Sequence, residues 1–228
     1  MNTPATVQEA TIMLRPQGDA CAAVTDEGQW LLLTPLNFAP GYDARFLKRW
    51  DRVRFVGDAK RTDARPEMRH VAARSMTVVR ESKPQEQQHL LEMLTHCSLQ
   101  IAEAQGLTLA LLKPKAAKLH VEKKKTGAAT TRNFGYHFLY SYQCDDGEFK
   151  TPYRDSEMDA MLDNLSKSYG EAKTVARIMQ VYGKEYPGRG MLFVMGRESP
   201  REPWIICGVV VTDEAVGGVD LSSLDLVC

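Results

Sequence analysis

Cationic and aromatic side chains follow one another closely in the middle of the chain, and together they could bind a nucleic acid. The cations are Lys113, Lys115, Lys118, Lys123, Lys124, Lys125 and Arg132, and Glu122 is the one acid among them. Rings then recur at every second residue, at Phe134, Tyr136, Phe138, Tyr140 and Tyr142. Proteins that bind single strands combine cations for the phosphates with rings on which the bases stack. We therefore expect a nucleic-acid site that includes these cations and the outer rings Tyr140 and Tyr142.

Both features also have a purely structural interpretation. Successive side chains of a strand point to opposite faces, so a strand over 134–144 would carry all five rings on one face. That face can be the core of a barrel, because every barrel strand needs one apolar side. The cations can likewise form a solvated loop that keeps an edge strand from pairing with other chains.

A second cationic segment runs from Arg61 to His70. Arg65 and Arg69 could bind a phosphate with their planar guanidinium groups. Asp63 and Glu67 could instead hold these arginines in structural ion pairs at a junction between two parts of the fold. We favour the structural interpretation for this segment.

Catalytic and metal-binding signatures are missing from the sequence. Glu122 and Lys124 fit the short acid–lysine motif of metal-dependent nucleases, but no second carboxylate occurs between Glu103 and Glu122 to share the ion. A serine nucleophile elbow and a phosphate-binding loop are also absent from the sequence. Neither the five cysteines nor the five histidines show the paired spacing of metal ligands. We therefore expect no catalytic residue, metal or cofactor, and we favour a protein that is not an enzyme.

Charge and hydropathy narrow the class of protein further. The 228 residues include 29 Lys and Arg and 29 Asp and Glu, so any site for a polyanion must be a local patch. No apolar run reaches the length of a membrane span, and the first residues do not have the pattern of a secretory signal. The cysteines are scattered, as in proteins of reducing compartments. These observations predict a cytoplasmic protein without membrane contact.

Short strand patterns at fairly regular spacing fill 10–82 and much of 107–211, which favours small β-barrels. The longest helical pattern runs from Pro84 to Gln105. Its apolar stripe consists of Leu90, Leu94, Cys97, Ile101 and Ala104. We predict a first barrel over 10–82, a bridging helix over 83–106, a second barrel with two helices over 107–211, and a weakly patterned tail over 212–228.

Several motifs in this order resemble a known family. They are Gly28-Gln29-Trp30 with Thr34-Pro35-Leu36, Arg45-Phe46 to Trp50-Asp51, Asp63 to Glu67, Phe138 to Asp146, Leu192 to Gly196 and Trp204 to Gly208. Over about Thr11 to Val211 the chain is similar to the bacterial dual OB-containing domain family. The resemblance implies a mainly β, α+β fold with two small OB-like β-barrels, together with nucleic-acid contact and no established reaction. In this family we expect a second cysteine shortly after the aromatic strand. Here Cys144 is followed by Asp145 and Asp146 and by no second cysteine near it.

Three hypotheses for the function remain open at this point. The first is a non-enzymatic protein that binds single-stranded DNA or RNA. The alternative is a protein-interaction subunit of a larger bacterial complex, such as a defence or mobile-element system. An enzyme that acts on a nucleotide is a third hypothesis, and it requires a cleft with perturbed carboxylates.

Overall fold

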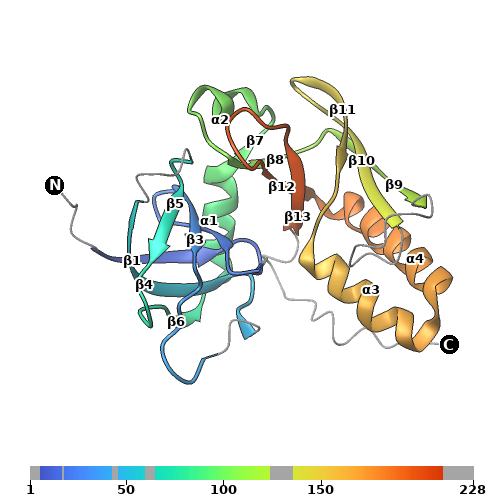
Figure 1. The fold of residues 1–228 in the computed structure, drawn as a ribbon. Helices are drawn as coiled ribbons and strands as arrows, with labels where there is room; N and C mark the ends of the chain where they lie inside the picture. The colour runs from blue at the N-terminus through green and yellow to red at the C-terminus, as the bar shows by residue number, and fades with distance from the viewer. Residues whose placement is uncertain (1–5, 17, 43–45, 60–64, 124–135, 213–228) are drawn as a thin grey trace.

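The first half of the chain forms a closed β-barrel. The computed structural model describes residues 6–16, 18–42, 46–59, 65–123 and 136–212, and the barrel lies on the left of Figure 1. Its strands are β1 (Thr6–Ile12), β2 (Cys21–Val24), β3 (Trp30–Thr34), β4 (Asp51–Ala59) and β5 (Met68–Val71). The order β1–β2–β3–β5–β4 closes because β1 pairs with both β2 and β4, while β3 and β5 pair in parallel. This is an OB-like barrel, and β6 (Thr77–Glu81) extends its wall beside β4.

Alternate side chains of these strands fill the barrel interior, as the two-residue period of a strand requires. Ala10 and Ile12 of β1 and Val53 and Phe55 of β4 are fully buried there. Leu47, from the connection between β3 and β4, packs into the same core. The predicted first barrel is therefore present.

The second half of the chain combines shorter strands with helices. It begins with α1, which lies between the barrel and the remaining elements (Figure 1). The elements are α1 (Pro84–Leu94), β7 (Thr95–His96), α2 (Gln100–Ala104), β8 (Leu109–Leu112), β9 (Ala116–Lys123), β10 (Tyr136–Cys144), β11 (Gly147–Pro152), α3 (Ser156–Tyr169), α4 (Glu171–Gln180), a π-helical turn (Val181–Glu185), a 3-10 turn (Pro187–Arg189), β12 (Met191–Gly196) and β13 (Ile205–Val211). The fold is thus mixed α and β with strands predominating.

Within the described ranges, the strands of this half form two sheets, ordered β11–β10–β9 and β13–β12–β8–β7. We call them the three-stranded sheet and the central sheet. β8 leads into β9 across a three-residue connection. At the other border, Tyr153 bridges in parallel to Ile206 of β13, and the Arg154 N–H donates to the Ile206 carbonyl at 2.8 Å. Both sheets contribute to one hydrophobic core together with α3 and α4.

The central sheet is buried on both faces, which explains its continuous apolar sequences. In β8, Leu109 and Leu111 pack toward the barrel, whereas Ala110 and Leu112 pack toward the core of the second half. The strands β12 and β13 alternate in the same way. The sheet therefore joins the two halves through a shared apolar layer.

The prediction of one helix from Pro84 to Gln105 is wrong. The helix ends at Leu94, Thr95 and His96 pair with β8, and a separate short helix follows at Gln100. Leu90 and Leu94 pack against the barrel, while Leu99 belongs to the core of the second half. The later members of the predicted stripe, Cys97, Ile101 and Ala104, are exposed, so the stripe does not continue beyond Leu94.

The strands of the second half do not form one continuous closed ladder. Among the described residues, β11 and β13 are joined by one bridge, from Tyr153 to Ile206. β11 ends at Pro152, and Asp155 caps α3 soon after. Apart from Thr212, the predicted tail over 212–228 lies outside the described residues. None of the described helices combines the length and the apolar character that a membrane crossing requires.

Candidate functional site

The aromatic strand β10 turns its rings inward. Tyr140 is fully buried, Tyr142 is 4% exposed and Phe138 is 2% exposed. The Tyr140 and Tyr142 rings lie 4.9 and 5.3 Å from the Phe193 ring, centroid to centroid, and the Tyr140 hydroxyl donates to the Tyr182 carbonyl at 2.7 Å. Burial raises the pKa of Tyr140, with the nearby Asp155 carboxylate as a further cause. The prediction that Tyr140 and Tyr142 are outer rings available to bases is therefore wrong.

The opposite face of the three-stranded sheet is open and polar. Its side chains lie in cross-strand rows that the pairing register defines. One row joins Lys118, Ser141 and Lys150, and the next joins Ala116, Gln143 and Glu148. On the other side of the first row lie His120, Leu139 and Pro152. We call this surface the outer face, and its members are exposed or half-buried.

A groove of about 530 Å³ crosses the outer face. Its lining residues are Ala116, Ala117, Lys118, Ser141, Tyr142, Gln143, Glu148, Phe149 and Lys150. All of them belong to β9, β10 and β11. Six of them lie in the two rows of the outer face, and Ala117, Tyr142 and Phe149 form the row between, whose side chains point to the opposite face. Its size falls within the roughly 300–1,000 Å³ that ligand pockets span.

The predicted cations are only partly brought together by this sheet. Lys113, Lys115, Lys118 and Lys123 are exposed, and Lys118 lines the groove. Lys115 is paired with Asp145, with its Nζ atom 2.8 Å from Oδ1. The predicted site residues Lys124, Lys125 and Arg132 lie outside the described residues.

Arg65 and Arg69 belong to the first barrel and not to this surface. They lie at and just before β5, on the other side of the molecule from the three-stranded sheet (Figure 1). Arg69 donates to the main-chain carbonyls of Pro66 and Met68. Glu67 contacts the second half: its carboxylate accepts from the Thr108 and Leu109 N–H groups. Glu67 therefore lies at the junction predicted for this segment, but its carboxylate binds main-chain groups of the second half.

The surface that OB barrels usually offer to a ligand is covered in the first barrel. That surface is formed by the second and third strands and the adjoining loops. Here the outward side chains of β2 and β3 lie in an apolar layer with α1 and the central sheet. The barrel contributes Ala22, Val24, Trp30 and Leu32, and the facing elements contribute Leu90, Leu94, Leu111, Leu192 and Val194. A strand of nucleic acid could reach these side chains only if the two halves separated.

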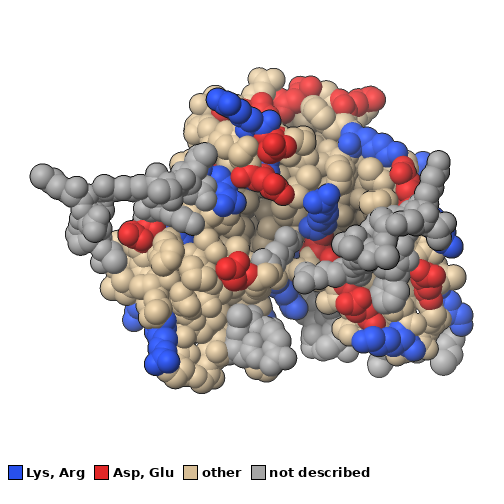
Figure 2. Space-filling view, in the orientation of Figure 1, with Lys and Arg blue, Asp and Glu red and all other residues tan. Residues whose placement is uncertain are grey.

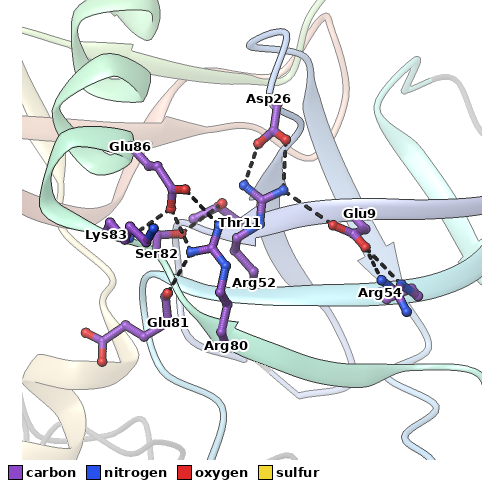
Figure 3. Close-up of polar contacts among 10 residues, drawn as sticks. All are labelled: Glu9, Thr11, Asp26, Arg52, Arg54, Arg80, Glu81, Ser82, Lys83 and Glu86. Atoms are coloured by element: carbon purple, nitrogen blue, oxygen red, sulfur yellow. Dashed lines mark hydrogen bonds and ion pairs between the residues drawn. The ribbon is translucent and has the colours of Figure 1, made fainter.

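A cluster of arginines on β4 and β6 of the first barrel is neutralised by carboxylates (Figure 3). Arg52 donates to both oxygens of Asp26, at 2.7 and 2.8 Å, and Arg54 donates to Glu9 at 2.6 Å. Arg80 pairs with Glu86 at the start of α1. Arg54 holds the pKa of Glu9 below its usual range. These pairs join β1, β4, β6 and α1, and we assign the cluster a structural role.

Charges of both signs are interspersed on the face seen in Figure 2, where the described residues form no broad cationic track. Among the described residues, no three His, Cys, Asp or Glu side chains are grouped as metal ligands would be. Cys144 is buried at the end of β10, and its thiol lies 3.9 Å from Asp146. The outer face with its groove is therefore our candidate ligand surface.

Sequence reasoning missed part of this groove. Lys150, Ser141 and Gln143 were not predicted as site residues, although Ser141 and Gln143 alternate with the rings along β10. That alternation could have identified them, because a strand with buried rings must turn its other side chains outward. The position of Lys150 depends on strand pairing, which no local pattern gives.

Neither a scan of family models nor a search of curated proteins found a match for this chain. The resemblance to the bacterial dual OB-containing domain family therefore stays a prediction.

Proposed function

We propose that this protein binds single-stranded nucleic acid, and that its second half is an open, OB-like barrel whose outer face carries the site. The pairing order supports the second barrel. β8 and β9 together act as one bent first strand, since β9 pairs with β10 and β8 pairs with β12. β10 pairs with β11, β12 pairs with β13, and the Tyr153–Ile206 bridge is parallel. The first barrel has the same order, with its parallel pair between β3 and β5.

The observation that carries the proposal is the position of the groove. In this correspondence β10 and β11 are the second and third strands, whose outward surface is the usual ligand face of an OB barrel. The equivalent face of the first barrel is buried against the central sheet, whereas the face of β10 and β11 is open and contains the groove. One barrel thus uses this face for internal packing, and the other leaves it for a ligand.

The cationic sequence supports the same surface. The connection between the first and second strands of an OB barrel is one of its two usual ligand loops. Here it is the connection between β9 and β10, whose sequence contains Lys124, Lys125 and Arg132 and follows Lys123 at the end of β9. We propose that these cations contact phosphates beside the outer face. Because Tyr140 and Tyr142 are buried, contacts to bases fall to outer-face residues such as His137 and Leu139.

Fluorescence anisotropy with a labelled oligothymidylate of fifteen nucleotides, measured at several salt concentrations, tests this function. We expect binding that weakens steeply as salt rises, since cation–phosphate contacts release counterions. Replacing Lys123, Lys124 and Lys125 together by Glu should weaken binding at least tenfold. The matched control replaces the exposed Lys167, Lys173 and Lys184 of other elements by Glu. Absence of salt-sensitive binding, or equal effects of the two triple variants, would contradict the proposal.

A protein-interaction subunit is the second candidate, and the charge distribution favours it. The net charge is zero, and both signs are interspersed on the face seen in Figure 2, so the described residues of that face offer no broad cationic track to a polyanion. This candidate predicts that the protein purifies from its native host with a partner protein and without nucleic acid. The test is purification of the tagged protein. Mass spectrometry then identifies bound proteins, and the ratio of absorbance at two ultraviolet wavelengths shows whether nucleic acid is bound. If a charge reversal on the outer face does not displace the partner, the partner binds another surface.

A further inference from the structure

The row formed by Lys118, Ser141 and Lys150 places two ammonium groups on either side of a hydroxyl. Ser141 lies on the middle strand and is in register with both lysines. Because neighbouring strands lie about 4.8 Å apart, the Cα atoms of the two lysines are separated by about 10 Å. All three residues line the groove. Their side chains can therefore approach one ligand group from two sides and from the floor.

The donors of this row match a tetrahedral oxyanion. Each lysine offers three N–H donors and no acceptor, and the serine adds an O–H donor. A phosphate has oxygens enough to accept from all three side chains, and charge-assisted hydrogen bonds of this kind are strong. Glu148 lies in the adjoining row, two residues from Lys150 on β11, and its carboxylate is already engaged because it accepts from the Gln143 amide at 2.6 Å.

The two lysines differ in how far they are already engaged. Lys118 makes no ion pair with any described residue. Lys150 contacts Glu122, with Nζ 2.7 Å from Oε1, and both side chains are about half exposed. An ion pair in water contributes little free energy, so a phosphate can replace Glu122 as the partner of Lys150.

We propose that the Lys118–Ser141–Lys150 row holds one internucleotide phosphate of a bound single strand. This inference rests on the proposed function and names the atoms that recognise the backbone. The adjoining row of His120, Leu139 and Pro152 provides a less polar surface for the next sugar or base, and histidine rings accept stacked bases. The phosphate contact positions the strand and carries no preference for sequence.

Single substitutions at the row, compared by anisotropy with the same oligothymidylate, test the inference. Lys118→Ala and Lys150→Ala should each weaken binding about three- to tenfold. Each should also reduce the slope of log affinity against log salt by about 0.7, the value for one phosphate contact on a single strand. Lys173→Ala, which removes the same charge from α4, is the matched control and should change neither quantity. All three side chains are exposed, and thermal melts confirm that the variants fold.

The outcomes separate this inference from the function on which it rests. If the oligonucleotide binds but the groove variants behave like Lys173→Ala, the phosphate position is wrong and the function stands. If the oligonucleotide does not bind, a pyrophosphate titration followed by amide chemical shifts tests the row directly. Shifts centred on Lys118, Ser141 and Lys150 that disappear in the double lysine variant would support the position, and uniform small shifts would overturn it.

Discussion

The carboxylate of Glu67 binds the main chain of Thr108 across the junction of the two halves. Oε1 lies 2.5 Å from the Thr108 nitrogen and 3.2 Å from the Leu109 nitrogen, and Oε2 accepts from the Thr108 hydroxyl at 3.2 Å. Glu67 is 1% exposed, and its own carbonyl accepts from the Leu32 N–H of β3. One residue of the barrel thereby satisfies the donors that precede and begin β8, where an unpaired N–H would be costly.

Replacing Glu67 by Gln should therefore destabilise the fold. Glutamine retains one acceptor oxygen but presents an NH₂ group to the buried donors of Thr108 and Leu109, which leaves at least one of them unpaired. We expect the free energy of unfolding to fall by about 1–3 kcal/mol. Urea unfolding followed by tryptophan fluorescence measures this loss. Glu27→Gln, in the exposed turn after β2, is the control and should stay within about 0.5 kcal/mol of the parent protein.

The burial of Asp155 leads us to expect that the stability of the fold depends on pH. It caps α3 by accepting from the Glu157 N–H at 2.8 Å, and it accepts from the Tyr153 hydroxyl at 2.7 Å. Burial raises the pKa of Asp155 from 3.8 to about 6, and the Glu157 carboxylate adds to the shift. Since the folded state binds this proton more tightly than the unfolded state, stability from this group is greatest below pH 4. It then falls as the pH rises through 6, by on the order of 3 kcal/mol.

The comparison that isolates this effect is with Asp155→Asn. Asparagine still caps a helix and has nearly the same shape, but it does not titrate. Between pH 4 and pH 7 the parent protein should lose stability relative to the variant in urea unfolding. Parallel curves for the two proteins over this range would show that Asp155 does not titrate as its burial implies.

Glu86 should make the stability of the fold depend on pH in the opposite direction, and more weakly. Hydrogen bonds from Arg80, and then from the Lys83 N–H, lower the pKa of Glu86 to about 2. Its contribution is complete above pH 4.5 and is lost as the pH falls toward 2. Because both side chains are about a third exposed or more, we expect Glu86→Gln to cost only about 0.5–1 kcal/mol at pH 7. The thermal midpoint should drop less at pH 3 than at pH 7, whereas Glu92→Gln on the same helix should change little at either pH.

Local pattern was enough to predict some elements of this fold. The alternation of rings predicted the strand β10, and the spacing of short strands predicted the first barrel. The same alternation could not say which face of β10 is the core, because one apolar face suits both a core and a stacking surface. Burial of Tyr142 against Phe193, a residue of a distant strand, decides that question.

Features that depend on pairing between distant segments could not be predicted. The stripe over 84–105 looked like one helix because Leu90, Leu94 and Ile101 keep helical spacing. The chain nevertheless breaks after Leu94, Ile101 is exposed, and Leu99 enters a second core instead. The groove also depends on register. Lys118, Ser141 and Lys150 come from three strands and meet only because both neighbours of β10 pair with it antiparallel.

Tyr140→Phe should separate stability from binding. The substitution keeps the buried ring but removes the hydroxyl that donates to the Tyr182 carbonyl, so a buried acceptor loses this partner. We expect a loss of about 1–3 kcal/mol in the free energy of unfolding. Affinity for the oligothymidylate should stay within twofold of the parent protein, because the ring lies inside the core and not on the outer face. Weaker binding by a variant that still melts cooperatively would mean that Tyr140 reaches the ligand, and would overturn the assignment of the site to the opposite face of β10.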